Sequence, residues 1–200
     1  MSPVSSARVE ALRILCRVEE DRAFADLALE AALERAKLPA RDRALTTEIV
    51  YGTLRWQRRL DWILAPHSRR RLDRLDPWVR NLLRLTVYQL QLLYKVPAYA
   101  AVNDAVALAK HRSHGEAAPF VNAVLRSLTR SGGNLPPLPE DPVEAAATRL
   151  AFPSWLARRW AKRFGLDEAE RLMTALDERP EVIVRVNLLR CTRADLAKRL

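Results

Sequence analysis

Apolar residues recur every three to four positions along most of the first 130 residues, which is the spacing of amphipathic helices. The residues that start and stop helices divide this stretch into six segments. Asp76 followed by Pro77 is the clearest start, because a carboxylate caps a helix and proline is tolerated at its first position. The six helices are predicted at residues 5–19, 24–37, 41–64, 77–94, 98–112 and 116–130.

The pattern changes at Ser131, where the segment SGGNLPPLPEDP holds two glycines and four of the twelve prolines of the chain. This composition is typical of a semi-stiff linker between domains. We therefore divide the chain into a helical domain at 1–130, a linker at 131–142, and a second unit at 143–200.

The second unit is predicted to begin with short helices that start at Pro142 and Pro153, the latter ending at Gly165. Asp167 is predicted to cap a third helix, and Thr192 with Asp195 resembles a capping box. Between them, VIVRVNL at residues 182–188 alternates β-branched and polar residues, which predicts a strand. Since one strand makes no sheet, we expect an incomplete α+β subdomain, cut off at Leu200, in a mainly α-helical protein.

The longest predicted helix, at residues 41–64, has two distinct faces. Its core stripe falls within about 80° of arc and consists of Leu45, Ile49, Gly52, Trp56, Leu60 and Ile63. Gly52 on this stripe predicts a close crossing by another helix. The second face carries Tyr51, Arg55, Arg58 and Trp62. Packing through arginine–aromatic contacts is the favoured interpretation of its aromatic residues, whereas its arginines remain candidates for binding a polyanion.

Net charge is concentrated in the second half of this helix and in the loop that follows it. The chain carries +10 overall, and residues 54–74 hold seven arginines against Asp61 and Asp73, or +5. Arginine provides a planar fork that matches phosphate and can stack on bases. Nucleic acid is therefore the favoured partner, and the alternative is an arginine-rich composition without a specific role.

A second basic cluster lies in PSWLARRWAKRFG, where Leu156, Trp160 and Phe164 form an apolar stripe. Four cations occupy the other side with no acid among them, and like charges at helical spacing repel. An anionic partner is favoured over a merely solvated face. The predicted RNA-binding residues are Arg55, Arg58, Arg69, Arg70, Arg71, Arg158, Arg159, Lys162 and Arg163. Such contacts would position RNA without reading its sequence.

Several other classes of protein are not favoured. Cys16 and Cys191 form no CxxC or Cys/His cluster, so no metal site is predicted and a reducing cytoplasm fits. The apolar run LTVYQLQLLY has ten residues, about half the roughly 20 that cross a bilayer, so no membrane partner is expected. The start MSPVSSARVE lacks the apolar region of a secretory signal.

Three blocks resemble a known family: EIVYGTLRWQRRLDWIL, RNLLRLTVYQLQLLYKVPAYAAVNDAVALAK and FVNAVLRSLTR. They look like the NusB-type helical bundle at the N-terminus of bacterial small-subunit ribosomal-RNA cytosine-5 methyltransferases, the RsmB or Sun/Fmu family. The segment from Leu150 to Leu189 resembles the next part of proteins in that family, a helical connector leading into an RNA-binding subdomain. The resemblance implies small-subunit ribosomal RNA as partner, rather than DNA, and S-adenosylmethionine as cofactor of the complete enzyme.

The chain departs from that family where the chemistry should lie. The family needs a later domain with a Gly-rich cofactor loop and two catalytic cysteines, in Pro-Cys and Thr-Cys contexts. Here the five glycines form no GxGxxG, Cys16 follows Leu15, and Cys191 follows Arg190. We therefore expect no catalytic, cofactor-binding or metal-binding residue in this chain, and a methyltransferase domain as its own missing C-terminal partner.

Two further interpretations concern residues inside the first domain. Cys16 is expected to be a core thiol, and Asn103 and Asn122, flanked by valines, are expected to be buried and structural rather than ligand-binding. The alternative function is a stand-alone NusB-like transcription antitermination factor that binds RNA and protein. The linker and the segment after it disfavour that alternative, because a free module should end near residues 131–140.

Overall fold

The computed structural model describes residues 4–93, 96–112, 117–178 and 183–199, and within them the regular structure is helical. The first part contains α1 (Ser6–Glu20), α2 (Ala25–Ala36), α3 (Ala40–Leu64), α4 (Pro77–Leu92), α5 (Ala98–His111) and α6 (Ala117–Arg130). The 3-10 turns η1 (Ala65–His67) and η2 (Leu72–Arg74) lie between α3 and α4. The mainly α-helical class and the six helices are confirmed. The expected end of α4 at Tyr94 and start of α6 at Glu116 lie outside the described residues.

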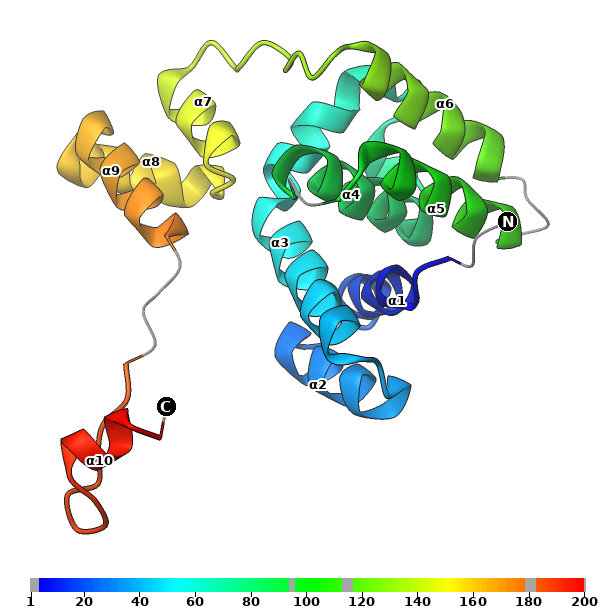
Figure 1. Cartoon of the computed structure of the whole chain (residues 1–200). Coiled ribbons are helices and arrows are strands. Elements are labelled where there is room, and N and C mark those ends of the chain that lie inside the picture. The colour runs from blue at the N-terminus through cyan, green and yellow to red at the C-terminus, as the bar shows by residue number, and fades with distance from the viewer. Residues whose placement is uncertain (1–3, 94–95, 113–116, 179–182, 200) are drawn as a thin grey trace.

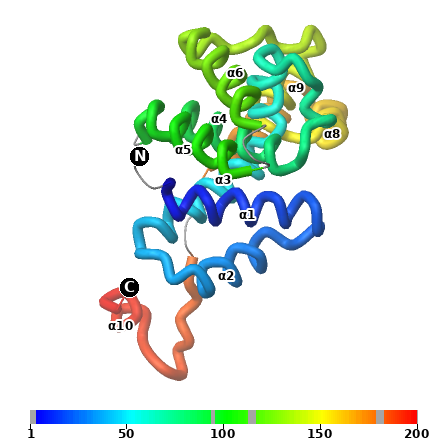
Figure 2. The backbone as a smooth tube through the Cα atoms, turned by 90° about the vertical axis from the view of Figure 1, so that its right-hand side faces the viewer, coloured from blue at the N-terminus to red at the C-terminus, as the bar shows by residue number. Residues whose placement is uncertain are grey.

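α3 is the central helix of the bundle. It packs against both α1 and α4, while α2 lies against α1, and α5 and α6 pair beside α4 (Figures 1 and 2). The shared core is built from large aliphatic side chains that are removed from water, among them Leu12, Ile49, Leu60, Leu82 and Leu125. Burial of each contributes about 1.5–3 kcal/mol to stability, so the bundle is held mainly by this core.

The predicted core stripe of α3 is largely confirmed. Ile49, Gly52, Leu60 and Ile63 are buried, and Trp56 is half-buried against the same core. A Cβ added to Gly52 would lie 1.9 Å from the ring of Tyr88 on α4, so the glycine admits the close crossing that the sequence predicted.

The second face of α3 differs in part from its interpretation. Trp62 packs as expected and donates a hydrogen bond from its indole to the carbonyl of Pro137, at 3.2 Å. The packing expected for Tyr51 is wrong, because its side chain stays 45% exposed. Tyr51 lies on the strip of α3 that no neighbouring helix covers completely.

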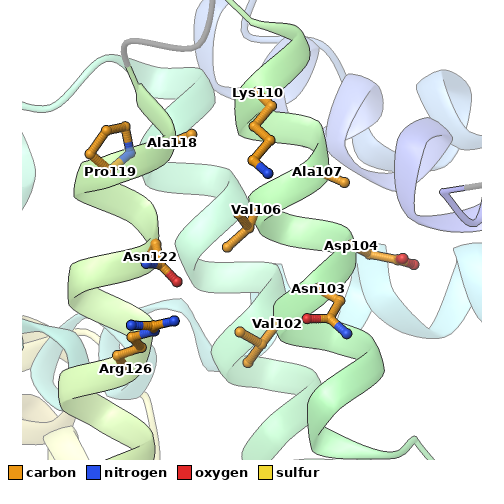
Figure 3. Close-up of a pocket in the computed structure, with 10 residues that line it drawn as sticks. All are labelled: Val102, Asn103, Asp104, Val106, Ala107, Lys110, Ala118, Pro119, Asn122 and Arg126. Carbon is orange, nitrogen blue, oxygen red and sulfur yellow. The ribbon is translucent and has the colours of Figure 1, made fainter. Parts of the chain in front are cut away.

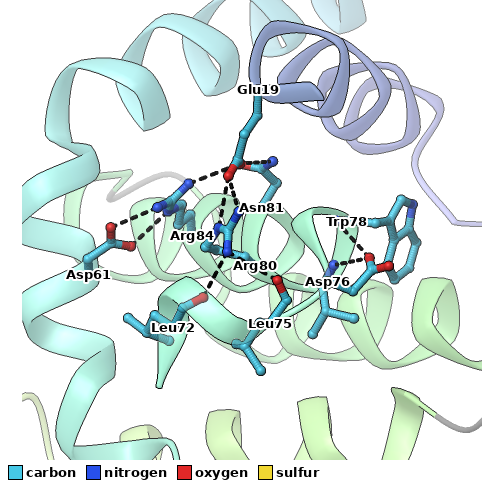
Figure 4. A network of polar contacts seen from close by, with 10 residues as sticks. Glu19, Asp61, Leu72, Leu75, Asp76, Trp78, Arg80, Asn81 and Arg84 are labelled. Carbon is cyan, nitrogen blue, oxygen red and sulfur yellow. Dashed lines mark hydrogen bonds and ion pairs between the residues drawn. The ribbon is translucent and has the colours of Figure 1, made fainter. Parts of the chain in front are cut away.

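A polar network joins α1, α3 and α4 and places the loop that follows α3 (Figure 4). Arg84 donates two bonds to Asp61, at 2.7 and 2.8 Å, and a third to Glu19 at 3.2 Å. Arg80 also pairs with Glu19 and donates to the carbonyls of Leu72 and Leu75, at 2.9 and 3.1 Å. The backbone of residues 72–75 is thereby tied to α4, with Leu75 buried in the core, while the arginines of the loop are exposed.

Three further helices follow the linker: α7 (Pro142–Arg149), α8 (Ser154–Phe164) and α9 (Leu166–Asp177). They share a small core of Ala146, Ala147, Ala157 and Met173. Figure 1 shows them to the left of α3, and α7 contacts that helix directly. This unit therefore packs against the face of α3 that carries the arginines.

Helix caps in the second part were predicted with mixed success. Asp141 caps α7 by accepting from the Val143 amide at 2.9 Å, and Thr192 and Asp195 form a capping box at α10 (Arg193–Ala197). The cap predicted at Asp167 is wrong: α9 begins at Leu166 and Gly165 occupies the cap position, so Asp167 lies in the first turn.

The predicted strand at residues 182–188 does not form in the described residues, where Ile183–Asn187 has no strand hydrogen bonding. Val182 lies outside the described part of the chain. A strand needs a neighbour to satisfy its backbone, and residues 183–199 contain no second strand that could supply one. Ile183, Leu188 and Leu189 are accordingly exposed.

Candidate nucleic-acid interface

The arginines of α3 are bonded to the second helical unit. Arg58 donates to the hydroxyl of Ser154 at 2.7 Å and to the carboxylate of Glu144 at 2.5 Å. Its side chain is only 29% exposed. A half-buried guanidinium that binds a carboxylate and a hydroxyl contributes to packing, so Arg58 holds α7 and α8 against α3.

Neighbouring arginines on α3 make equivalent contacts. Arg55 donates to the carbonyl of Leu176 at 2.6 Å and forms an ion pair with Asp177. Arg59 donates to the carbonyl of Arg149 at 3.0 Å, and its guanidinium lies 5.4 Å from the centre of the Trp56 ring. RNA contact by Arg55 and Arg58 stays a prediction, but their guanidinium groups already have acceptors in the protein.

The loop between α3 and α4 presents a different set of arginines. Arg69, Arg70, Arg71 and Arg74 are all exposed. Arg71 binds Asp73 through two hydrogen bonds of 3.1 and 2.8 Å, which lower the pKa of that carboxyl group. Within the described residues, Arg69, Arg70 and Arg74 have no ion-pair partner. Three positive charges are therefore left for an external anion.

These loop arginines lie beside α6 and the end of α5. One pocket of about 350 Å³ is lined by Arg70, Arg74, Arg112 and Phe120 among others, and a second of about 440 Å³ by Arg69, Arg130 and Phe120 among others. Arg70 lies over the Phe120 ring at 5.7 Å from its centre. The loop and α6 together form one basic and partly aromatic surface.

A histidine helps to join the loop to α6. Nδ1 of His67, in η1, lies 3.0 Å from the hydroxyl oxygen of Ser127 on α6. Burial lowers the pKa of His67, so the ring is neutral at pH 7. His67 therefore contributes position rather than charge to this surface.

Sequence reasoning missed the part of the surface that α5 and α6 provide. We call the whole the loop–α6 surface, and its cations are Arg69, Arg70, Arg74, Arg112, Arg126 and Arg130. A signal was present, because residues 117–130 contain two arginines and no acid. Arg112 differs from the other five cations because an acid lies near it. Its guanidinium is 3.9 Å from the Asp76 carboxylate and also lies over the Trp78 ring.

The two asparagines correct another prediction. Asn103 is exposed and Asn122 is half-buried, so neither is the buried structural amide that the flanking valines indicated. Both line a pocket of about 920 Å³ between α5 and α6, together with Lys110 and Arg126 (Figure 3). Val102 and Val106 line the same pocket, Asn122 lies one helical turn before Arg126, and Asn103 lies two turns before Lys110.

The sequence of α8 contains no acid, as the prediction noted, but the fold brings two acids from α7 and its cap next to the cations of α8. Arg158 binds Asp141 and Glu144, each at 2.9 Å, and both acids belong to the start of α7. Arg159 and Lys162 are exposed without an ion pair in the described residues. Arg163 lies over the Phe164 ring at 5.4 Å from its centre. The α8 face therefore has fewer available charges than its sequence indicates.

Other kinds of site are not evident. Burial raises the pKa of the Cys16 thiol to about 12, so Cys16 is an inert core thiol as expected. Among the residues described, no three His, Cys, Asp or Glu side chains group closely enough to hold a metal ion. No helix in the described ranges is long and apolar enough to span a membrane.

Two family models match the chain. The NusB family matches residues 5–130, which cover α1 to α6. The ferredoxin-like domain of RsmF/B-like methyltransferases matches residues 152–200, which begin just before α8.

Curated relatives fall into two groups. A probable ribosomal RNA small subunit methyltransferase B of Bacillus subtilis is 38% identical over 192 residues, 96% of this chain and 43% of the relative. A similarly named protein of Synechocystis is 33% identical over 98% of this chain and 44% of the relative. The transcription antitermination protein NusB of Nocardioides is 35% identical over 68% of this chain and 99% of the relative. The chain thus spans less than half the length of the methyltransferase relatives.

Solved structures also fall into two groups, those that match about two thirds of this chain and those that match nearly all of it. NusB in a structure of the antitermination factors NusB and NusE with double-stranded RNA is 26% identical, with a TM-score of 0.57 over 62% of this chain and 94% of that chain. A structure of the protein PH0851 shares the fold over 96% of this chain and 43% of that chain, with a TM-score of 0.68 at 22% identity.

Proposed function

Since the chain belongs to the NusB family, we propose that its 200 residues are the RNA-recognition portion of an S-adenosylmethionine-dependent ribosomal-RNA (cytosine-5) methyltransferase. The relatives that match nearly the whole chain are small-subunit ribosomal RNA methyltransferases. The second family match, at residues 152–200, is to a domain of such enzymes. The proposed partner is therefore small-subunit ribosomal RNA, met in the cytoplasm.

The observation that carries this proposal is the loop–α6 surface. Arg69, Arg70 and Arg74 lie with Arg130 around Phe120, Arg126 lies beside Arg130 further along α6, and none of these five arginines has an ion pair among the described residues. Unneutralised arginines on one face repel each other, and a polyphosphate relieves that repulsion while releasing its own counterions. Arg159, Lys162 and Arg163 on α8 form a second and smaller contact in this proposal.

Methyl transfer itself is assigned to a part of the longer relatives that this chain does not match. The described residues do not fit S-adenosylmethionine, because no glycine follows a strand to form a cofactor loop. Gly52 lies under Tyr88, Gly132 and Gly133 follow α6, and Gly165 separates α8 from α9. Cys16 is buried, and its raised pKa disfavours the thiolate that methyl transfer to cytosine would require.

A second candidate function rests on a specific observation. The chain matches 99% of the length of a NusB antitermination protein over 136 residues, and the NusB family match covers α1–α6. The contacts of Arg55, Arg58 and Arg59 with α7–α9 favour the methyltransferase interpretation, because they tie the bundle to the unit that follows it.

The proposal is tested by measuring the affinity of the 200-residue chain for labelled fragments of small-subunit ribosomal RNA by fluorescence anisotropy. We expect salt-dependent binding that prefers at least one fragment over DNA of the same sequence. Equal binding to all fragments and to DNA would contradict recognition of ribosomal RNA. Preferred binding of a short antitermination leader RNA over every ribosomal fragment would favour the second candidate.

A further inference from the structure

One tryptophan of the chain lies outside any core. Trp155, in the first turn of α8, is 64% exposed, whereas Trp56, Trp62, Trp78 and Trp160 are half-buried. An indole is large and apolar, and soluble proteins usually cover most of its surface. A single exposed apolar side chain is common on soluble proteins, so the neighbours of Trp155 decide what it can bind.

Local packing explains why Trp155 faces outward. Ala157 is fully buried in the small core of α7–α9, and Trp160 packs on Phe152 with ring centres 5.7 Å apart. These two residues fix the inner side of α8. At about 100° per residue, Trp155 lies roughly 140–160° away from both of them, on the outer side.

The same rotation places two cations beside the indole. Arg159 and Lys162 follow Trp155 by four and seven positions, so they lie within about 40° of it on the helix surface. Both are exposed, and in the part of the chain that is described neither has an ion-pair partner. Arg158 borders this strip but is held by Asp141 and Glu144. The outer side of α8 thus presents an aromatic ring next to two available positive charges.

An exposed indole beside two available cations favours one kind of partner. An apolar protein surface would cover Trp155 but would also have to remove Arg159 and Lys162 from water without an anion to bind them. A nucleotide supplies both needs, because its base stacks on the ring and its phosphates bind the cations. In a duplex the bases are already stacked and paired, so only an unpaired base is free to stack on a tryptophan.

We propose that Trp155 is a stacking platform for an unpaired RNA base, with Arg159 and Lys162 binding the adjacent phosphates. This inference rests on the proposed RNA-recognition function, and it narrows the substrate at α8 to a single-stranded segment. It also gives α8 a role that differs from that of the loop–α6 surface, where charge dominates.

The test compares four variants of the 200-residue chain: Trp155→Leu, Trp155→Phe, Arg159→Gln with Lys162→Gln, and Tyr99→Leu. Tyr99 is a matched control, because it is an aromatic side chain that is 72% exposed on α5 and is followed at helical spacing by Val102 and Asn103 rather than by cations. Affinity is measured for a single-stranded RNA and for a blunt-ended RNA duplex of the same composition, at several salt concentrations. Thermal unfolding midpoints check that each variant is folded.

We expect Trp155→Leu to weaken single-strand binding by roughly 5- to 150-fold, the range for loss of one base–aromatic stack. Trp155→Phe should retain most of the affinity, and Tyr99→Leu should change nothing. The salt dependence should be unaltered in Trp155→Leu but reduced in the Arg159/Lys162 variant. The slope of log affinity against log salt should fall there by about 0.7 for each phosphate that the protein no longer neutralises.

Three outcomes would overturn the platform. Unchanged single-strand binding by Trp155→Leu, in a chain that still loses affinity when the loop arginines are replaced, would reject the platform and leave the proposed function standing. Equal weakening for duplex and single strand would reject the assignment to unpaired RNA. Absence of RNA binding by the unaltered chain would overturn the proposed function and the platform together.

Discussion

Two groups of arginines stand close together in the sequence and have opposite surroundings. Arg55, Arg58 and Arg59 on α3 are bonded to Asp177, Glu144 and backbone carbonyls of the second helical unit. Arg69, Arg70 and Arg74, in the loop after α3, have no ion pair in the described residues. One group joins parts of the protein, and the other faces solvent beside α6.

The difference arises from residues far away in the sequence. The acceptors of the α3 arginines lie 86 to 122 positions further along, whereas the described part of α6 brings Phe120, Ser127 and Arg130 to the loop and contains no acid. Charge density alone therefore does not separate a structural arginine from a binding one. The two kinds are separated by whether the fold brings an acid or another cation to the same place.

The largest loss of stability is expected from replacing Arg84, a structural arginine whose effect serves as the reference for the other variants. Replacing it by methionine leaves Asp61 without its guanidinium partner and leaves Glu19 with Arg80 and Asn81 only, at the junction of α1, α3 and α4. Removing one member of such a buried network costs about 3–5 kcal/mol in the free energy of unfolding, measured by urea denaturation. A loss below about 1 kcal/mol would show that the network is dispensable.

A smaller effect is expected at Arg58, because its surroundings are only partly buried. Replacing Arg58 by glutamine should cost about 1–2 kcal/mol and should speed protease cleavage in the linker at residues 131–141. A double-mutant cycle with Glu144→Gln isolates the pair, and a coupling of about 1 kcal/mol is expected. A coupling energy of zero would mean that Arg58 and Glu144 do not stabilise each other. Arg58 would then contribute no more to stability through an ion pair than the loop arginines do.

Acidification should weaken the same junction. The Ser154 hydroxyl, together with Arg58 and Arg158, holds the pKa of Glu144 below its usual value of 4.5. A lowered folded-state pKa contributes stability that is complete above about pH 4.5 and is lost as the pH falls through the folded value. Proteolysis of the linker by an acid protease should therefore rise as the pH falls below about 4.5. The Glu144→Gln chain should show a smaller pH dependence, and equal profiles would exclude Glu144 as the titrating group.

Helical periodicity and cap residues were sufficient for most of the fold. They located α1 to α9 and the core stripe of α3, because these depend on neighbours within a few positions. They failed for the predicted strand, since residues 183–187 have no strand partner in the described part of the chain, and for Asp167, where Gly165 ends one helix and the next begins directly after it.

The candidate site was less predictable, because contacts between segments far apart in the sequence bring its residues together. Arg69 and Arg70 were found from charge density, but Arg126 and Arg130 join them only in the folded bundle. Glu144 and Asp141 neutralise Arg158 although they lie on another helix. Val121 and Val124 are buried as expected, but Asn122 between them and Asn103 line the pocket between α5 and α6, which Val102 and Val106 also line.

The salt dependence of RNA binding tests the contrast between the two arginine groups most directly. Two triple variants remove the same number of arginines: Arg69, Arg70 and Arg74 in the loop, or Arg55, Arg58 and Arg59 on α3, each replaced by glutamine. Because each phosphate contact contributes about 0.7–0.9 to the slope of log affinity against log salt, the loop variant should flatten the slope by about two without a change in unfolding free energy. The α3 variant should change the slope by less than one and lose stability. Equal slopes for the two variants, or an unchanged slope in the loop variant, would contradict the assignment of the loop–α6 surface to RNA.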